Sequence, residues 1–430
     1  MSKLIWAVRP LIALLALVGQ VPAGHGEDLI ILTSFPPAFY EPITEKFQQS
    51  HPDITVEIVQ RSTTSAVRFL LERDRVDVDV FWASSPDAFE LLKSQNQLAV
   101  LQVSTPLEDR TVAGYPVNDV DNTYFGFAFS TFGAAYNPDY LARHDLPVPR
   151  RWSDLTLPAY WGHVGVTSPS RSGTTHFIVE AILQTYGWDQ GWALIARMGG
   201  NLSTITARSF GIADGIEQAR FGLGPSIDFL ATVERSSDAI AFAVLDPLFL
   251  VPASVAVLER SASPTAGAAF VDFLLSTDVQ LMLMSPQLGR IPVIDELRTL
   301  ALAKRGTRLP APLLDNGATF DAALSAHRYG LVNALFDAWI VDHRSEISAI
   351  WARVNTMDAT SARSLISLLT QPPIDELRAL ELMAIPNDAG YGGPIEEMPE
   401  VSEEISQAVS GRLSMIASEL ERVASNPATQ

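Results

Sequence analysis

Residues 29–59 read LIILTSFPPAFYEPITEKFQQSHPDITVEIV. The first six residues, LIILTS, form a β-branched run, a helical pattern follows around residues 39–50, and the stretch closes on a second β-branched run, ITVEIV. A further helical pattern (66–73) and a further strand pattern (78–84) come next. Strands that alternate with helices in this way are typical of a parallel α/β sheet.

The middle of the chain indicates a second unit of the same kind. YFGFAFSTFGAAYN (124–137) is apolar and aromatic with embedded glycines, unlike the earlier strands, and we interpret it as a crossing between two lobes. Strands of the second lobe and of the returning chain are then predicted at HVGVTS (163–168), LSTIT (202–206), GLGPSIDF (222–229), AIAFAVL (239–245) and PASVAVLE (252–259). A strongly helical pattern, TAGAAFVDFLLSTDVQLMLM (265–284), follows. Two similar units joined by crossing strands predict a cleft between them.

The C-terminal third has no strand pattern. From about Asp295 the apolar residues recur at helical spacing, most clearly over residues 320–385, which predicts a packed helical extension. NDAGYGGPIEEMPE reads as a linker, and a last helix is expected near residues 401–423. The fold class is therefore α/β, with two lobes, a hinge and a C-terminal α-helical extension.

The N-terminus predicts export. Lys3 and Arg9 precede the apolar run 11–18, which is followed by small residues, as in a cleaved secretory signal peptide. Loss of Lys3 and Arg9 moves the formal net charge from −19 to −21, which disfavours a nucleic-acid partner. The chain has no cysteine, so an exported form must depend on a large core instead of disulfides. We expect the mature protein to be periplasmic.

These patterns predict a domain organisation with explicit bounds. The predicted units are a signal peptide (1–26), a two-lobe solute-binding domain (27–295), a helical extension (296–385), and a linker with a terminal helix and flexible tail (386–430). Within the second unit, lobe 1 is expected at about 27–125 and 245–295, and lobe 2 at about 130–240.

The stretch SPSRSGTTH (168–176) suggests what the cleft binds. It lies between a predicted strand and the helical pattern FIVEAIL. The start of a helix has unpaired N–H groups and a partial positive charge, so it attracts anions. Gly173 lets a ligand approach the backbone, and Arg171 offers a forked cation for phosphate or carboxylate. Equally, serine is a routine helix cap, glycine a routine turn residue, and His176 a typical structural histidine.

Other strand-to-helix junctions carry residues of the same types. Arg61 is followed by hydroxyl residues in the first lobe, and Arg208 precedes Ser209 in the second. Each of these arginines could instead be an ordinary surface residue. The candidate ligand-binding residues are Ser34, Arg61, Thr63, Thr64, Ser84, Ser85, Ser170, Arg171, Ser172, Gly173, Thr174, Thr175, His176, Arg208, Ser209 and Asp228.

Several longer segments, taken in order, resemble a known family. LIILTSFPPAFYEPITEKFQQSHPDITVEIV, DVDVFWASSPDAFELL, FGFAFSTFGAAYNPDYL and PTAGAAFVDFLLSTDVQLMLMSPQLGRIPV resemble the extracellular solute-binding proteins of ABC transporters, in the group allied to ferric-iron-binding proteins. The resemblance covers roughly residues 28–295. It implies the type II periplasmic binding protein fold, which closes on its ligand by a hinge motion, and a permease partner in the inner membrane.

The resemblance also bears on the ligand. Ferric-iron members use neighbouring tyrosines of the second lobe, but this chain has no tyrosine between Gly187 and Tyr329. SPSRSGTTH and TARSFGIADGIEQARFGLGPSIDF are more similar to the branch with phosphoglycerate transport regulatory proteins and sugar-phosphate binders. That branch implies a small anionic, phosphorylated organic solute, with Asp228 accepting from its hydroxyls. Asp228 could equally cap a turn.

Three functions therefore compete. The first is a periplasmic substrate-binding protein for an anionic solute, with ferric iron as the alternative ligand. The second is a ligand sensor for a membrane kinase, with the helical extension as docking surface. The third is a hydrolase, which the sequence disfavours because it shows no nucleophile motif. The histidines lack metal-ligand spacing, so we expect no metal site and no cofactor, no enzyme activity, and a monomer.

Overall fold

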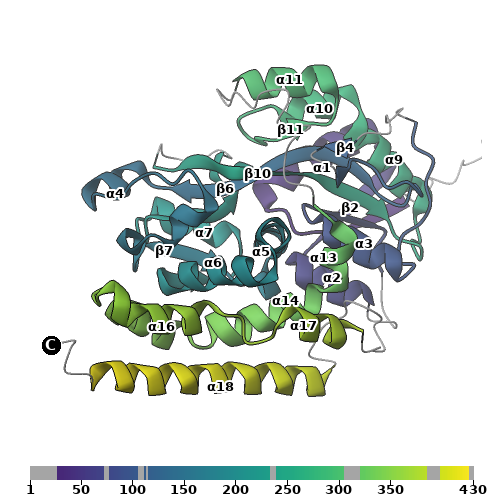
Figure 1. Ribbon diagram of the computed structural model, residues 1–430. Coiled ribbons are helices and arrows are strands. Elements are labelled where there is room, and N and C mark those ends of the chain that lie inside the picture. The colour runs from purple at the N-terminus through teal and green to yellow at the C-terminus, as the bar shows by residue number, and fades with distance from the viewer. Residues whose placement is uncertain are drawn as a thin grey trace, which may run out of the picture.

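The computed structural model describes residues 27–71, 77–104, 111–112, 115–232, 239–304, 320–384 and 398–425. The predicted signal peptide and most of the predicted linker lie outside these ranges. Figure 1 shows a sheet flanked by helices, with further helical layers on one side of it.

The main sheet has nine strands, in the order β2-β1-β3-β10-β6-β9-β7-β8, with β11 paired to β6. The neighbours of β1 run parallel to it, as do both neighbours of β7, as expected for βαβ units. The strands are β1 (Glu27–Thr33), β2 (Ile54–Gln60), β3 (Val80–Ala83), β6 (Phe125–Tyr136), β7 (Val164–Thr167), β8 (Leu202–Thr206), β9 (Leu223–Ile227), β10 (Ala241–Val257) and β11 (Ile291–Pro292); a separate hairpin pairs β4 (Thr111–Val112) with β5 (Tyr115–Pro116).

Two long antiparallel strands cross between the lobes. Strand β6 is the crossing that the sequence predicts, and β10 is its partner. The two strands predicted at 239–245 and 252–259 are one strand, because the pairing resumes after an irregularity between Val244 and Phe249. Pro247 lies inside that irregularity, where a residue without an N–H does not interrupt the ladder. Both crossing strands contribute to both halves of the sheet.

The lobes are defined by the helices that cover each half of the sheet. The first lobe comprises β1–β3 with α1 (Pro37–Ser50), α2 (Thr63–Leu71), α3 (Pro86–Ser94), α9 (Pro264–Leu275) and α10 (Thr277–Leu283). The second lobe comprises β7–β9 with α4 (Pro138–Arg143), the short helical turn η3 (Pro169–Arg171), α5 (Gly173–Tyr186), α6 (Trp188–Gly200), α7 (Phe210–Glu217) and α8 (Asp228–Thr232). This is the two-lobed α/β fold with crossing strands that the sequence predicts.

The helix predicted at 265–284 is broken. Ser276 adopts an extended conformation between α9 and α10, and its hydroxyl oxygen accepts a hydrogen bond from the Val279 N–H. Helices α9 and α10 reach the length and apolar content of a membrane-spanning helix only when they are counted together, and the pair is bent by 59°. Apart from that pair, none of the described helices could cross a membrane.

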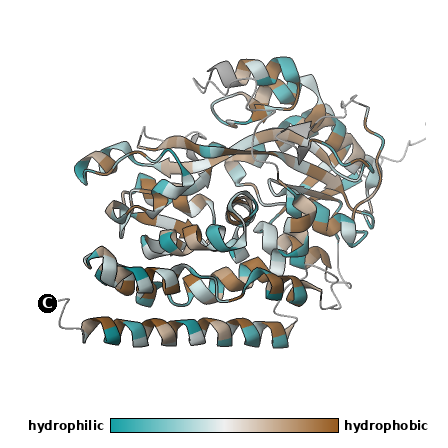
Figure 2. Cartoon of the chain, viewed as in Figure 1, coloured by the Kyte–Doolittle hydropathy of each residue, from teal (hydrophilic) through white to brown (hydrophobic). Residues whose placement is uncertain are grey.

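The C-terminal extension is helical, as predicted, and folds onto both lobes (Figure 1). Its terminal helix packs one apolar face inward and turns a polar face outward, which Figure 2 shows as alternating colours. The buried face of that helix joins the same hydrophobic core as both lobes. The elements are α11 (Asp295–Lys304), α13 (Ala322–His327), α14 (Tyr329–Phe336), a π-helix (Asp337–Val341), α15 (Arg344–Val354), α16 (Ala359–Thr370), α17 (Glu376–Met383) and α18 (Pro399–Ala424).

Polar contacts join the extension to the second lobe. Arg328 makes a buried, forked ion pair with Glu180 of α5, at 2.9 Å for the closest atoms. The indole N–H of Trp188 donates to the Ile374 carbonyl at 2.9 Å. Ala326 packs into the apolar cluster of the first lobe, so α13 also touches α3. The extension therefore bridges the lobes.

Candidate functional site

A small cavity lies between the lobes, at the carboxyl ends of their parallel strands. This edge is where open α/β sheets bind ligands. The cavity volume is about 30 Å³, which is room for about one water molecule. Its walls are Ser34, Phe35, Pro36, Ser62, Thr63 and Ser84 from the first lobe, and Arg171, Ser172, Gly173, Thr174, Arg208, Ser209, Phe210, Phe229 and Leu230 from the second. We call this cavity the cleft.

The first turn of α5 forms one wall of the cleft. The Ser172 hydroxyl oxygen accepts from the Thr175 N–H at 3.1 Å and so caps the helix. The N–H groups of Gly173 and Thr174 precede the first intrahelical bond and have no hydrogen-bond partner within the described residues. One serine of the motif therefore caps the helix, which is its routine role, and the anion-binding role of the motif stays a proposal.

The lobes touch where Gly173 meets the first lobe. A methyl group added at Gly173 would lie 2.8 Å from Thr63 Cβ, 2.8 Å from Thr63 Oγ1 and 2.8 Å from Ser85 Oγ. Thr63 is the first residue of α2, so the N-termini of α2 and α5 face each other across the cleft. Only a residue without a side chain permits this approach.

Two arginines of the second lobe flank the cleft. Arg171 is exposed at the end of the short turn η3, and Arg208 is half-buried, with its guanidinium 5.8 Å from the ring centroid of Phe210. Both can reach a ligand with a forked donor set. The cleft thus combines two cations, hydroxyl groups and helix N-termini.

The structure brings nine of the sixteen candidate residues to the cleft. These are Ser34, Thr63, Ser84, Arg171, Ser172, Gly173, Thr174, Arg208 and Ser209. Their binding of a ligand remains a proposal, whereas their convergence is a feature of the fold.

Four other candidates are engaged elsewhere. The Arg61 guanidinium stacks 4.5 Å from the Phe69 ring centroid. Ser85 donates to the Asp87 carboxylate at 2.6 Å, and Asp228 accepts from the Thr131 N–H and hydroxyl at 3.1 Å each. The last candidate in this group, Thr175, is buried inside α5. Ser85 is the N-cap residue of α3, but its hydroxyl does not accept a capping hydrogen bond.

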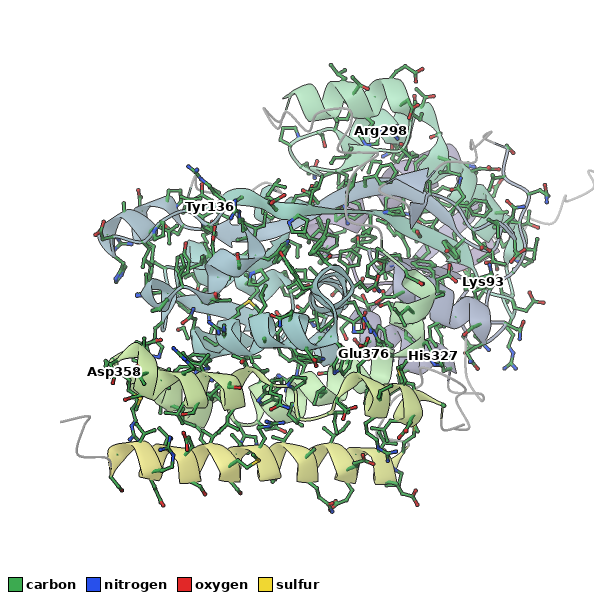
Figure 3. All side chains as sticks on the ribbon, in the orientation of Figure 1. Lys93, Tyr136, Arg298, His327, Asp358 and Glu376 are labelled. Carbon is green, nitrogen blue, oxygen red and sulfur yellow. The ribbon has the colours of Figure 1, made fainter. Side chains whose placement is uncertain are left out.

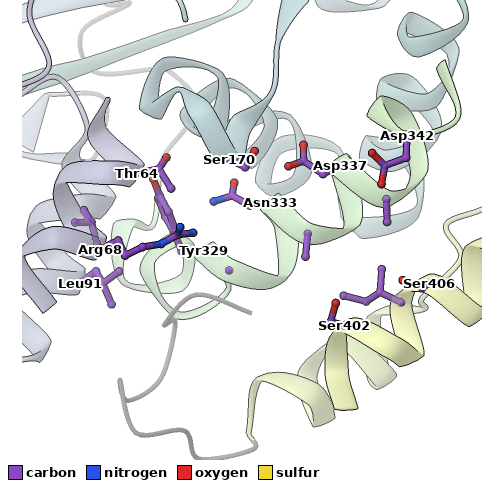
Figure 4. Close-up of a pocket in the computed structure, with 15 residues that line it drawn as sticks. Thr64, Arg68, Leu91, Ser170, Tyr329, Asn333, Asp337, Asp342, Ser402 and Ser406 are labelled. Atoms are coloured by element: carbon purple, nitrogen blue, oxygen red, sulfur yellow. Dashed lines mark hydrogen bonds between the residues drawn. The ribbon is translucent and has the colours of Figure 1, made fainter. Parts of the chain in front are cut away.

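The remaining three candidates face the extension. Thr64 shares a hydrogen bond of 3.1 Å with the hydroxyl of Tyr329, and Ser170 shares one of 2.6 Å with Ser168. Figure 4 shows Thr64 and Ser170 on the wall of a second cavity, of about 220 Å³, between the lobes, α14 and α18. The third residue, His176, is fully buried.

His176 forms an ion pair between the lobes. Its Nε2 lies 3.1 Å from Oδ2 of Asp87, which belongs to α3, and its Nδ1 lies 2.7 Å from Oδ1 of Asn333. Burial by itself lowers the pKa of His176, but the charge and hydrogen bond of Asp87, with the charge of Glu180, outweigh it and hold the pKa above its usual range. Burial likewise raises the pKa of Asp87, and His176 reverses the direction, so that pKa is lowered. The predicted ligand role of His176 is replaced by this bridge.

The sequence does not predict two kinds of residue at the cleft. The aromatic side chains of Phe35, Phe210 and Phe229 line the cleft, although a sequence pattern gives no way to tell a cleft aromatic from a core one. Arg290 lies directly behind the wall; its Nη2 donates to the Ser84 hydroxyl oxygen at 2.7 Å, and its guanidinium lies 3.6 Å from the Phe229 ring centroid. The only signal for it was a cation in the otherwise apolar GRIPV motif.

A metal-binding alternative would require clustered histidine, carboxylate or tyrosine side chains. The described ranges contain no group of three or more histidine or carboxylate side chains placed to hold an ion. Among the described residues that line the cleft there is no tyrosine. Asp79 accepts hydrogen bonds from the Ile30 N–H and the Ser261 hydroxyl, so its role is structural.

The two-lobed fold, with a polar cleft at the strand ends, defines a solute-binding protein of the type II periplasmic class. The chain belongs to the family described as bacterial extracellular solute-binding protein, whose pattern matches residues 78–308. It is 30% identical over 367 residues to the phosphoglycerate transport regulatory protein PgtC of Salmonella typhimurium, and to PgtC of Salmonella typhi, covering 85% of this chain and 87% of each relative.

Solved structures share the fold. The periplasmic binding protein AfuA from Actinobacillus pleuropneumoniae, with fructose 6-phosphate bound, superposes with a TM-score of 0.59 at 17% identity, covering 76% of this chain and 98% of AfuA. The apo ferric-ion-binding protein A of Pasteurella haemolytica gives a TM-score of 0.57 at 15% identity, covering 72% of this chain and 97% of that protein. At such identities the likeness concerns the fold alone.

Proposed function

We propose that this protein is the periplasmic substrate-binding component of an ABC transporter, that its signal peptide is cleaved, and that it captures a small phosphorylated organic anion in the cleft. The observation that carries the proposal is the convergence of two arginines, two helix N-termini and several hydroxyl groups from both lobes on one gap. The relatives named for phosphoglycerate transport make a phosphoglycerate the first solute to test.

The geometry supports capture of an anion without a metal. Arg171 and Arg208 supply forked cationic donors, and Gly173 and Thr174 belong to the first turn of α5, which lines the same cleft. Hydrogen bonds to charged groups contribute about 1.5–3 kcal/mol each before ordering costs. About four to six of them therefore account for micromolar binding.

The cleft must open to admit such a solute. Its volume of about 30 Å³ is far below the roughly 300 Å³ or more of typical small-molecule sites. Separation of the lobes about β6 and β10 would enlarge it, and closure on the solute would exclude water. In the proposed cycle the closed, loaded protein docks on the permease and releases the solute there.

Isothermal titration of the mature protein tests the proposal. The panel contains 2- and 3-phosphoglycerate, fructose 6-phosphate, unphosphorylated glycerate and ferric citrate. We expect heat with the phosphate esters and not with glycerate, and a roughly tenfold or larger loss of affinity in each of Arg171→Gln and Arg208→Gln. Arg143→Gln is the matched control, because Arg143 is exposed on α4 and does not line the cleft. Binding of ferric citrate alone would replace this proposal by iron capture.

A second role, as a ligand sensor, draws on the extension. The extension touches both lobes, so closure changes the surface where α13 meets α3. A membrane sensor could read that change. Because α18 shares the core of the lobes, deleting the extension would unfold the protein, so charge-reversal on the outer face of α18 is the suitable test. Reversal of Glu403 should then abolish ligand-induced signalling and leave ligand affinity unchanged; unaltered signalling would exclude that docking surface.

The proposal includes two simpler statements. We propose that the protein acts as a monomer and that it releases its solute chemically unchanged. Sedimentation of the loaded protein and ³¹P NMR of the recovered ester would test them, and a dimer or free inorganic phosphate would contradict them.

A further inference from the structure

Arg290 is buried in the interior of the protein, directly before β11, which pairs with the crossing strand β6. Gly289 has a φ of 59°, which favours glycine and turns the chain inward after α10. The Arg290 N–H donates to the Leu283 carbonyl at 2.8 Å. The next residue, Ile291, pairs with Phe129 of the crossing strand β6. Arg290 is thus anchored next to a crossing strand, about which the lobes would move in the proposed cycle.

The guanidinium of Arg290 is in contact with the back of the cleft wall. It is fully buried, and it donates to the hydroxyl oxygens of Ser84, at the end of β3, and of Ser130, on β6. It also lies 3.6 Å from the ring centroid of Phe229 and 5.0 Å from that of Phe35. Ser84, Phe229 and Phe35 all line the cleft. One cation therefore lies behind three wall residues.

The hydrogen bond to Ser84 determines what that hydroxyl offers to a ligand. A serine hydroxyl has one O–H to donate and two lone pairs that accept. Because the Arg290 N–H occupies a lone pair of Ser84, the Ser84 hydrogen is free to point into the cleft. A hydroxyl that accepts from a cation is also polarised and becomes a stronger donor. Ser84 is then a donor suited to an oxyanion.

The charge itself also favours an anion. An arginine side chain stays protonated in proteins, and a charge away from water acts over longer distances than a surface charge.

We propose that Arg290 is a positioning residue for anion selectivity: it orients the Ser84 hydroxyl as a donor into the cleft and places a fixed positive charge behind the wall. The inference rests on the proposed function and adds to it a residue that the strand-to-helix junctions do not contain. Arg171 and Arg208 would approach the solute from the second lobe, and the Arg290–Ser84 pair from the first.

A double-mutant cycle on the mature full-length protein tests this role, with 3-phosphoglycerate as the titrant. The variants are Ser84→Ala, Arg290→Gln and the double variant. We expect each single variant to lose roughly tenfold in affinity, and the double variant to bind about as weakly as the weaker single variant, because both changes remove one contact. Fully additive losses would overturn the proposal.

Two further variants separate this role from a structural one. Arg298→Gln is the control, because Arg298 is also buried and lies 5.5 Å from the Phe129 ring centroid, but belongs to α11 (Figure 3) and not to the cleft wall. Its affinity should equal that of the natural protein. Arg290→Lys keeps the charge and should recover part of the affinity. An equal loss in Arg298→Gln, or no recovery with lysine, would indicate a structural role only.

The outcomes also distinguish this inference from the proposed function. If the natural protein binds no phosphate ester, the proposed function fails and Arg290 has no anion to select. If it binds and Arg290→Gln binds equally well, only the inference fails. If Arg290→Gln does not fold, the cycle is repeated with Arg290→Lys, and additive losses with Ser84→Ala would again overturn it.

Discussion

Replacing Gly173 by alanine tests whether the contact between the two helix N-termini controls closure of the cleft. The added Cβ would lie 2.8 Å from each of three atoms, Thr63 Cβ, Thr63 Oγ1 and Ser85 Oγ. Carbon atoms in contact prefer a separation of about 3.5–4.0 Å, so the lobes must move apart by roughly 1 Å. Ser85 cannot yield easily, because its hydroxyl is held by Asp87 at 2.6 Å.

The strain falls on the closed form alone. Overpacking of this kind costs about 1–3 kcal/mol, which lowers the ratio of closed to open molecules roughly 5- to 150-fold. Because the apparent affinity falls with the fraction of closure-competent molecules, the dissociation constant for 3-phosphoglycerate should rise by up to the same factor. Small-angle scattering of the unliganded protein should show a larger radius of gyration.

Gly411→Ala is the matched control. Gly411 is an exposed glycine inside α18, and a Cβ there would meet nothing within 4 Å. That variant should keep the affinity and the radius of gyration of the natural protein. If Gly173→Ala did the same, the interlobe contact would not limit closure, and the reasoning would be refuted.

Three further predictions concern the contacts of the extension and of the interlobe ion pair. Because the pKa of His176 is raised, its charged pair with Asp87 stabilises the fold fully below the usual histidine pKa of about 6.5, and this stabilisation is lost as the pH rises through the raised pKa. The melting temperature of the natural protein should therefore fall over that pH range, and His176→Gln should remove part of that fall. An unchanged pH profile in His176→Gln would contradict the pairing. Tyr329→Phe deletes the hydroxyl contact with Thr64, so the free energy of unfolding in urea should fall by about 0.5–1.5 kcal/mol, and no fall would show that the contact is not formed in solution. Ile405→Ala opens a cavity beneath α18 and should lower the free energy of unfolding by about 2–5 kcal/mol by calorimetry; a value near zero would mean that α18 does not dock.

Much of the fold follows from local patterns in the sequence. The alternation of β-branched runs and helical patterns predicts the strands β1, β2 and β3 to within two residues at each end, since runs of β-branched and aromatic residues favour strands. The apolar run at 124–137 predicts the crossing strand β6 for the same reason. The patterns do not predict that β10 is continuous, because Pro247 and its neighbours interrupt the apolar run while the backbone continues in the sheet.

The residues of the candidate site are likewise predicted only in part by local sequence patterns. Strand-to-helix junctions identify Ser84, Arg171 and Arg208, because parallel strands place their carboxyl ends at one edge whatever the details of packing. They cannot distinguish Thr63, which faces the cleft, from Thr64 beside it, which faces the extension. Which way a side chain points at such a junction depends on the elements packed against it.

By itself, the sequence determined the class of fold and the polar residues at the strand-to-helix turns, and it predicted export, because these depend on periodicity, composition and the chemistry of helix starts. Only the tertiary structure decided that His176 joins Asp87 in an ion pair between the lobes and that Arg290 lies behind Ser84. Those pairs join residues 89 and 206 positions apart in the chain, brought together by packing across the hinge, and no local pattern records such a distance.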